Sequence, residues 1–322
     1  MRWQDIRKAV VIGTGQMGPG IAYTLAFAGC QVALCGRSQE SLQRGMQALQ
    51  TAVSTLIENE CISPMDGAAI LKRVEVTTNV ESAVKDADLV TESIVEDLLT
   101  KQDLFIRLER WCPPHTILTS NTSGLPATLL ADHLSRPERF AVTHYWNPPH
   151  LMPLVEIVKG ERTSQETVDV LVELLRAAEK KPVVVHKDTP GQLGNRLFHA
   201  LIREAIWIVQ EGIASPEDVD TAFRMGPGRR APVWGVLEHQ DAAGLDMVLA
   251  IQSYMCRALC NETEPARILS EKVAAGELGI KAGKGFYDWT QRDFQARIRQ
   301  RDAFLIERLK ADRASNGAGT TS

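Results

Sequence analysis

A short apolar run leads directly into a glycine-rich turn near the start of the chain, and the two together constrain the fold. Lys8–Ile12 is expected to form a buried strand, and the run GTGQMG at 13–18 follows it and opens a helix. Through residue 186, similar short runs alternate with longer helical segments. Such alternation implies crossover connections and a mostly parallel sheet. The sequence therefore predicts an α/β fold with a doubly wound sheet.

The glycine-rich turn has the spacing of a dinucleotide site. The first glycine permits a tight turn, the second lets the backbone approach a pyrophosphate, and the third allows close packing of helix on sheet. The motif alone is weak, but its position after the first strand and before a second strand favours this function. We therefore expect an N-terminal Rossmann-type domain that binds NAD or NADP through Gly13, Gly15, Gln16, Met17 and Gly18.

The end of the second expected strand, Gln31–Cys35, bears on the choice of cofactor. An acid usually follows this strand and binds the adenosine ribose, but here Gly36 follows it. Arg37 supplies a cation that can pair with a 2′-phosphate, and Ser38 can add a hydroxyl. The less favoured alternative is that Arg37 is a solvated loop cation, and the simpler interpretation of Ser38 is the cap of the next helix. The sequence favours NADP and leaves NAD open.

The pattern changes after Asp188, where strand-like runs give way to helical spacing. We expect a dinucleotide-binding domain over residues 1–188 and a smaller all-helical domain for substrate binding and dimerisation over 189–289. Residues 290–322 are expected to form a helical extension that ends in a disordered tail, SNGAGTTS.

Composition excludes several kinds of function. The formal net charge is −4, with acids and bases interspersed, which argues against a nucleic-acid or anionic-membrane partner. No apolar stretch approaches the roughly 20 residues that span a bilayer. The cysteines are scattered without metal-ligand spacing, which suits a reducing compartment and predicts no metal site. We expect a cytoplasmic protein that acts on a small molecule.

Four polar residues follow expected strand ends or open the first helix of the second domain: Ser123, His144, Glu156 and Asn195. Moving hydride to or from an alcohol carbon requires a group that handles the hydroxyl proton, and a histidine backed by a carboxylate suits this near pH 7. Glu156 is a single acid in the apolar run LVEIV, and a buried carboxylate is costly unless it is paired. On spacing alone, a structural histidine remains the simpler interpretation of His144.

The sequence resembles the 3-hydroxyacyl-CoA dehydrogenase family over nearly its whole length, through VTESIVEDLLTK, SNTSGL, HYWNPPHLMPLVEIV, DTPGQLGNRL and GKGFYDW. The resemblance implies that His144 is the general base and Glu156 its orienting partner. It also implies that Ser123 and Asn195 hydrogen-bond the substrate oxygen. By the same resemblance, four further residues lie around the nicotinamide ribose or the inner site: Glu96, Lys101, Asn121 and Asn147. For the other six histidines we keep a structural interpretation.

The sequence also departs from the family pattern, beyond Gly36 and Arg37. Gln192 and Gly194 stand where the family generally has bulky apolar residues, which predicts a more polar or roomier floor of the site. Arg229 and Arg230 lie in a segment that is uncharged in thioester-using members. The double arginine resembles more the branch of lambda-crystallin and L-gulonate 3-dehydrogenase, the latter acting on a free hydroxy acid. These arginines could bind a free carboxylate, or they could pair with surface acids or a helix end.

Three hypotheses follow for the function. The leading one is an oxidoreductase that moves hydride between a nicotinamide cofactor and C3 of a short-chain 3-hydroxyacyl-CoA, as in fatty acid metabolism. The second is a dehydrogenase of a free 3-hydroxy acid or a related small alcohol. The third is a non-catalytic, crystallin-like protein, which would not require all four polar residues. Because the family usually dimerises through its helical domain, we also expect a homodimer.

Overall fold

The structure is a computed structural model that describes residues 1–318. The chain forms two compact units. One contains residues 1–195 together with the C-terminal segment from residue 300, and the other contains residues 196–299. All four predicted catalytic residues belong to the first unit.

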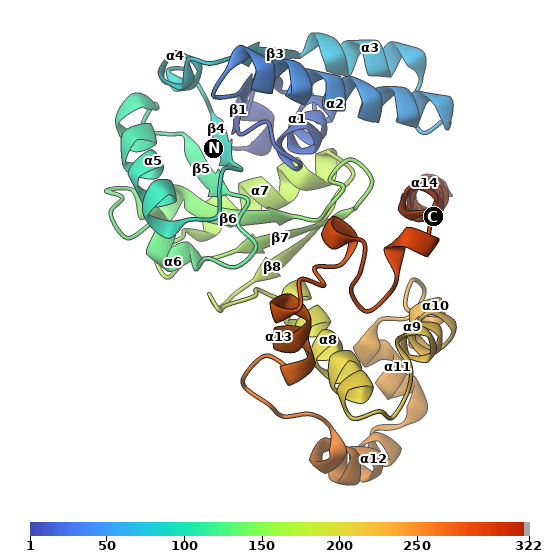
Figure 1. The fold of residues 1–322 in the computed structure, drawn as a ribbon. Coiled ribbons are helices and arrows are strands. Elements are labelled where there is room, and N and C mark those ends of the chain that lie inside the picture. Colours follow the sequence, from blue (N-terminus) through green and yellow to red (C-terminus); the bar gives the residue numbers. More distant parts are fainter. Residues whose placement is uncertain (319–322) are drawn as a thin grey trace. The chain divides into compact units, whose positions relative to one another are not determined.

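The first unit is built on an eight-stranded sheet in the order β3-β2-β1-β4-β5-β6-β7-β8 (Figure 1). Neighbouring strands are parallel except for β6 and β7, which run antiparallel. This confirms the predicted α/β class with a mostly parallel sheet. The strands are β1 (Lys8–Ile12), β2 (Gln31–Cys35), β3 (Val74–Thr77), β4 (Leu89–Glu92), β5 (Ile117–Ser120), β6 (Phe140–Tyr145), β7 (Leu154–Val158) and β8 (Lys181–Val185).

Helices cover both faces of this sheet because its strands are apolar on both sides. Along β1, Ala9 and Val11 point into one core, and Val10 and Ile12 point into the other. The first core is covered by α1 (Gly18–Phe27), α2 (Gln39–Glu58), α3 (Pro64–Lys72) and α7 (Gln165–Ala177), and the second by α4 (Val80–Val84), α5 (Leu98–Trp111) and α6 (Ala127–Leu130).

The last helix, α14 (Phe294–Ala318), adds its second half to the first core. Ile306 is buried there, and Leu305 and Leu309 pack against the same cluster. Arg313 pairs with Glu179 at 2.6 Å. The expected disorder of the tail is wrong for residues 315–318, which continue the helix, and residues 319–322 lie outside the described part of the chain.

The second unit is helical, and its apolar side chains are largely exposed. It contains most of α8 (Gly194–Gln210), then α9 (Pro216–Met225), α10 (Pro227–Arg230), α11 (Val236–Ala243), α12 (Leu245–Ala258) and α13 (Arg267–Ala274), with short 3₁₀ turns at Ile280–Ala282 and Trp289–Gln291. Cys260 is its only buried residue, whereas Leu237 is 80% exposed and Leu249 is 70% exposed. By itself this unit has no buried hydrophobic core.

Candidate active site

The glycine-rich turn between β1 and α1 has the geometry that a pyrophosphate requires. Gly13 has φ of 121°, and a Cβ there would lie 2.2 Å from the Ser93 carbonyl oxygen. A Cβ on Gly18 would lie 1.8 Å from the Gly13 carbonyl oxygen, so only glycine fits at either position. A Cβ on Gly15 would meet nothing within 4 Å, which leaves open space beside the start of α1. Backbone that no side chain covers at this place can approach a dinucleotide phosphate closely.

Gln16 and Met17 complete this turn. Gln16 is exposed, and Met17 is the residue that precedes the first turn of α1. The predicted phosphate-binding residues therefore lie in one loop at the N-terminus of a helix, where backbone N–H groups and the helix dipole favour an anion.

The position after β2 is closely surrounded by side chains, which would have to shift to admit a larger residue. A Cβ on Gly36 would lie 2.7 Å from the Ser41 hydroxyl and 2.8 Å from Leu42 Cδ2. Arg37 is exposed and, within residues 1–318, makes no ion pair. The Ser38 hydroxyl accepts a hydrogen bond from the Ser41 N–H, so Ser38 caps α2, as its structural interpretation predicts.

His144 and Glu156 meet at the antiparallel junction of the sheet. They are direct partners in the β6–β7 register, and His144 Nδ1 lies 2.7 Å from Glu156 Oε2. The Glu156 side chain is fully buried and that of His144 is 7% exposed. Since Nδ1 faces the carboxylate, Nε2 is the imidazole nitrogen left to exchange a proton with another molecule.

Glu156 accepts four hydrogen bonds, which hold it as a carboxylate. Besides His144, the donors are the Trp146 indole to Oε2 at 3.1 Å and the Leu193 and Gly194 N–H groups to Oε1 at 2.9 and 2.8 Å. Burial by itself would raise the pKa of Glu156. The hydrogen bonds from His144, Gly194, Trp146 and Leu193 outweigh burial and lower this pKa to about 2. Glu156 is therefore ionised beside the imidazole at neutral pH.

Ser123 and Asn195 are joined to this pair through the start of α8. The Asn195 amide donates to the Ser123 carbonyl oxygen at 3.0 Å, and the adjacent Gly194 N–H reaches Glu156. The Ser123 side chain lies in an exposed loop after β5. The structure thus links the four predicted catalytic residues in one chain of contacts: His144 to Glu156, Glu156 to the Leu193–Gly194 backbone, and the next residue, Asn195, to the Ser123 carbonyl.

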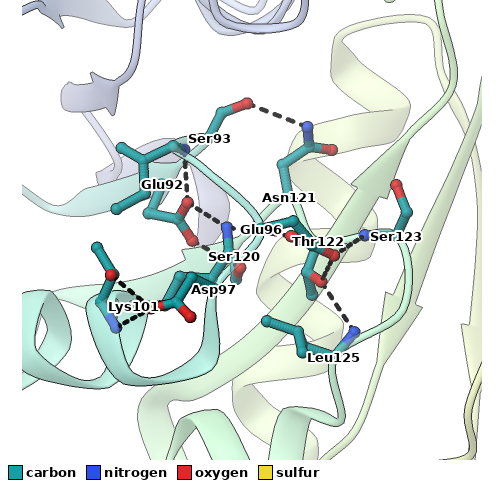
Figure 2. A network of polar contacts seen from close by, with 12 residues as sticks. Glu92, Ser93, Glu96, Asp97, Lys101, Ser120, Asn121, Thr122, Ser123 and Leu125 are labelled. Atoms are coloured by element: carbon teal, nitrogen blue, oxygen red, sulfur yellow. Dashed lines mark hydrogen bonds and ion pairs between the residues drawn. The ribbon is translucent and has the colours of Figure 1, made fainter.

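A second polar network lies at the ends of β4 and β5, and Figure 2 shows its members facing one another. Lys101 pairs with Glu92, and both side chains are fully buried. Glu92 also accepts from the Ser120 hydroxyl at 2.7 Å and from the Ile94 N–H at 2.6 Å. The Lys101 ammonium also lies 3.4 Å from Glu96. The predicted cofactor residue Lys101 is therefore held by carboxylates of the protein.

Glu96 and Asn121 organise the loop that carries Ser123 (Figure 2). Glu96 accepts from the Thr122 hydroxyl and from the Ser123 N–H, the latter at 3.0 Å. Asn121 donates to the Ser93 hydroxyl at 3.2 Å and accepts from the Tyr145 N–H at 2.9 Å, so it ties β4 to the end of β6. The exposed Asn147 follows β6 and is joined to Pro148 by a cis peptide bond.

The two departures after residue 190 do not make the floor roomier. Trp146 fills the space over Gly194, where a Cβ would lie 2.5 Å from indole Cζ2. Gln192 is buried with φ of 54°, and its amide donates to the Thr122 carbonyl at 2.9 Å. Of the two predicted alternatives, a more polar or a roomier floor, these contacts favour the first, because the ring at position 146 occupies the space at Gly194.

Arg229 and Arg230 belong to the second unit, at the end of the short helix α10. Both are exposed, and within residues 1–318 neither pairs with an acid. Arg229 contacts the Met225 sulfur at 3.9 Å. Pairing with surface acids is therefore wrong for the described residues. The other part of that alternative, a position at a helix end, agrees with the structure.

His150, the histidine nearest to the motif, is packed into the protein. Its ring lies 6.5 Å from that of Tyr23, centroid to centroid. Burial lowers the pKa of His150 to about 4, and the nearby Lys180 charge adds to this shift. A half-buried ring that is neutral near pH 7 fits the structural interpretation.

Two residues of the site escaped the sequence reasoning, Glu92 and Trp146. Glu92 carries the signal that identified Glu156, a single acid at the end of an apolar run, LVTE. Trp146 is signalled by Gly194, because a glycine in place of a bulky residue points to a larger neighbour.

Comparison with known proteins identifies the family. Residues 8–189 match the family described as 3-hydroxyacyl-CoA dehydrogenase, NAD binding domain, and residues 191–289 match its C-terminal domain. The chain belongs to the 3-hydroxyacyl-CoA dehydrogenase family. It is accordingly a dehydrogenase-type oxidoreductase with a Rossmann-type NAD binding domain, as the resemblance implied.

Relatives within this family differ in substrate. A probable 3-hydroxybutyryl-CoA dehydrogenase of Bacillus subtilis is 37% identical over 291 residues, which cover 89% of this chain and 99% of that protein. The 5-formyl-3-hydroxy-2-methylpyridine 4-carboxylate 5-dehydrogenase of Mesorhizobium japonicum is 36% identical over 301 residues, covering 94% and 96%. A solved structure of a 5-dehydrogenase of that pyridine carboxylic acid, described as an NAD⁺ dependent dismutase, matches with a TM-score of 0.89 and 35% identity, covering 96% and 99%.

Among the described residues, none of the helices combines the length and the apolar character that a bilayer crossing requires.

Proposed function

We propose that this chain is a dehydrogenase in which His144 exchanges the proton of a substrate hydroxyl while hydride moves between the carbon that bears it and a nicotinamide. The observation that carries the proposal is the buried contact between His144 Nδ1 and Glu156 Oε2 at 2.7 Å. This contact leaves Nε2 available to exchange the substrate proton. It also places a carboxylate beside the imidazole, which becomes positively charged when it accepts that proton.

In the oxidation direction, His144 Nε2 accepts the hydroxyl proton and the ring becomes an imidazolium. Glu156 stabilises that charge and fixes the orientation of the ring. A bound nicotinamide dinucleotide supplies the carbon that accepts the hydride. Ser123 and Asn195 are proposed to hydrogen-bond the substrate oxygen as negative charge develops on it. Reduction runs the same steps in reverse, with His144 returning the proton.

We infer that the substrate is a small hydroxy acid, or a related alcohol or aldehyde, with a free carboxylate. Arg229 and Arg230 are exposed guanidinium groups without acidic partners in the described chain, and such groups bind carboxylates in a bidentate manner. The likeness to the pyridine-carboxylate enzyme extends over 94% of this chain, whereas that to the Bacillus protein extends over 89%. A thioester has no free carboxylate at the acyl end for these cations to bind.

The second candidate substrate is a short-chain 3-hydroxyacyl-CoA, which family membership and the Bacillus relative favour. A substrate panel separates the two classes: 3-hydroxybutyrate and hydroxymethyl or formyl aromatic acids against 3-hydroxybutyryl-CoA and acetoacetyl-CoA, each followed by NAD(P)H absorbance. Turnover confined to the CoA thioesters would refute the free-carboxylate proposal.

The variant Arg230→Ala tests whether Arg230 binds the carboxylate of a free acid. We expect it to raise KM for a free acid and to leave KM for a thioester nearly unchanged, because only the free acid presents a carboxylate to the arginine. An equal effect on both classes, or no effect on either, would remove Arg230 from substrate binding.

For the cofactor, we infer that Arg37 favours NADP over NAD. The support is the exposed guanidinium of Arg37, which makes no ion pair within residues 1–318, and the absence of an acid at Gly36. The family domain is described by NAD binding, and the solved relative as NAD⁺ dependent, so NAD is the competing cofactor in this test.

We further propose a homodimer formed through residues 196–299. The support is the exposed apolar surface of this unit, in which Leu237, Leu249 and Val236 are each at least two-thirds exposed and Cys260 alone is buried. Water-exposed apolar area of this extent marks an interaction site. A second copy of the same unit supplies a matching surface.

A further inference from the structure

Trp146 lies two residues after His144 and shares its partner. The indole N–H donates to Glu156 Oε2 at 3.1 Å, the same oxygen that His144 Nδ1 contacts at 2.7 Å. The two rings are tilted by 51°, with centroids 5.7 Å apart. Oε2 of Glu156 therefore accepts a hydrogen bond from each of the two rings.

Gly194 makes this arrangement possible. A Cβ at position 194 would lie 2.5 Å from Trp146 Cζ2 and 3.3 Å from Cε2, so any larger residue would displace the indole. The Gly194 N–H also donates to the other oxygen of Glu156 at 2.8 Å. The large ring at 146 and the missing side chain at 194 form a matched pair around one carboxylate.

We propose that Trp146 is a positioning residue for the proton transfer, whose indole N–H fixes the rotation of the Glu156 carboxylate and takes up part of the charge on Oε2. This inference rests on the proposed role of His144 as general base. A carboxylate that loses one donor acts more strongly on the donor that remains. Removing the indole N–H therefore raises the pH at which the His144 imidazolium gives up its proton.

Few charged groups lie near His144, so a change in its titration can be assigned to its contact with Glu156. Glu156 on β7 is the titratable group in contact with the imidazole within residues 1–318. Glu96 and Lys101, on the segment from β4 to α5, contact each other, and Glu96 reaches the Thr122–Gly124 loop while Lys101 reaches Glu92. The backbone donors at Leu193 and Gly194 bind the opposite oxygen, Oε1.

The deciding variant is Trp146→Phe, which keeps an aromatic ring and removes the donor. The His144 ring is titrated by NMR in full-length protein labelled at histidine, and its resonance is assigned by its loss in His144→Gln. In parallel, kcat/KM is measured against pH with the best substrate of the panel. We expect the NMR midpoint and the acid limb of kcat/KM to rise together by about 0.5 pH unit. Trp111→Phe, at the far end of α5 with its ring near Arg107, is the matched control and should shift neither.

Gly194→Ala supplies an independent arm. Its methyl group should push the indole away and produce the same upward shift as Trp146→Phe. Added to Trp146→Phe it should produce no further shift, because the clashing indole atoms are gone.

The two readouts separate the two proposals. An NMR midpoint in Trp146→Phe within about 0.2 pH unit of the wild-type value would overturn the role of Trp146, whatever the kinetics. A midpoint that moves while the kcat/KM profile stays fixed would support the Trp146 contact and overturn His144 as the base.

Discussion

His144 and Glu156 are direct partners across the only antiparallel pairing of the described sheet, with Nδ1 2.7 Å from Oε2. Their contact is therefore set by the register of β6 and β7 rather than by a loop. Because successive side chains of a strand point to opposite faces, a slip of one residue would separate the two groups completely. The sheet itself thus holds the proposed base against its carboxylate.

Glu156 should make stability depend on pH in acid. Its pKa of about 2 lies below the ordinary value of 4.5. Its contribution to the free energy of unfolding is therefore complete above about pH 4.5 and is lost as the pH falls toward 2. The shift corresponds to on the order of 3 kcal/mol at neutral pH. Urea unfolding at pH 7 and pH 3 should show that Glu156→Gln costs clearly less at pH 3. An equal cost at both pH values would contradict the depressed pKa.

Lys101 should matter for stability because it is half of a fully buried ion pair. Lys101→Met leaves the Glu92 carboxylate buried without its cation, which should lower the free energy of unfolding by about 3–5 kcal/mol. The double variant Glu92→Leu/Lys101→Met should recover part of this loss, since no uncompensated charge remains. Urea unfolding of both variants checks this. A double variant less stable than the single one would count against the pairing as the cause.

Arg37 should control cofactor preference. A charge-assisted contact to a 2′-phosphate contributes about 1.5–3 kcal/mol to binding. Arg37→Ala should therefore lower kcat/KM for NADPH by roughly 10–100-fold and leave kcat/KM for NADH nearly unchanged. Steady-state kinetics with both cofactors check this, and Arg44→Ala, exposed further along α2, serves as the control. A wild-type preference for NADH would refute the prediction outright.

The helical unit should bring two chains together. Light scattering after gel filtration is expected to give twice the chain mass of 35.5 kDa. Leu249→Asp places a charge in the exposed apolar surface and should shift the protein toward monomer, while Glu211→Ala, at a polar exposed position, should not. A monomeric wild-type protein at micromolar concentration would contradict the dimer.

Local sequence patterns were sufficient to predict most of the first unit. The β-branched runs, the serine cap and the glycine turn each specify a local conformation, and the observed β1 and β2 have the predicted bounds. Glu156 was expected to need a partner because an acid in an apolar strand is costly without one. The strand register then supplies that partner, and it follows from the fold rather than from spacing.

Contacts between distant segments were missed, because local patterns do not specify which side chains pack together. The Trp146–Gly194 pair joins residues 48 positions apart in sequence, and its effect on the floor of the site is a matter of ring size and backbone position. Glu92 was missed because it stands at the end of a strand, and its burial and its pairing with Lys101 depend on the fold. The helical course of residues 315–318 was missed because a polar, glycine-containing end is compositionally similar to a disordered tail.

The role of His144 in proton transfer is best tested by the rate of hydride transfer in His144→Gln. Single-turnover stopped-flow measurements, with cofactor and substrate saturating, report this step directly. If His144 is the base, this rate is lower by about 10²–10⁴-fold in the variant, with the Kd for the cofactor unchanged. A rate within a few-fold of wild type would show that another group exchanges the proton.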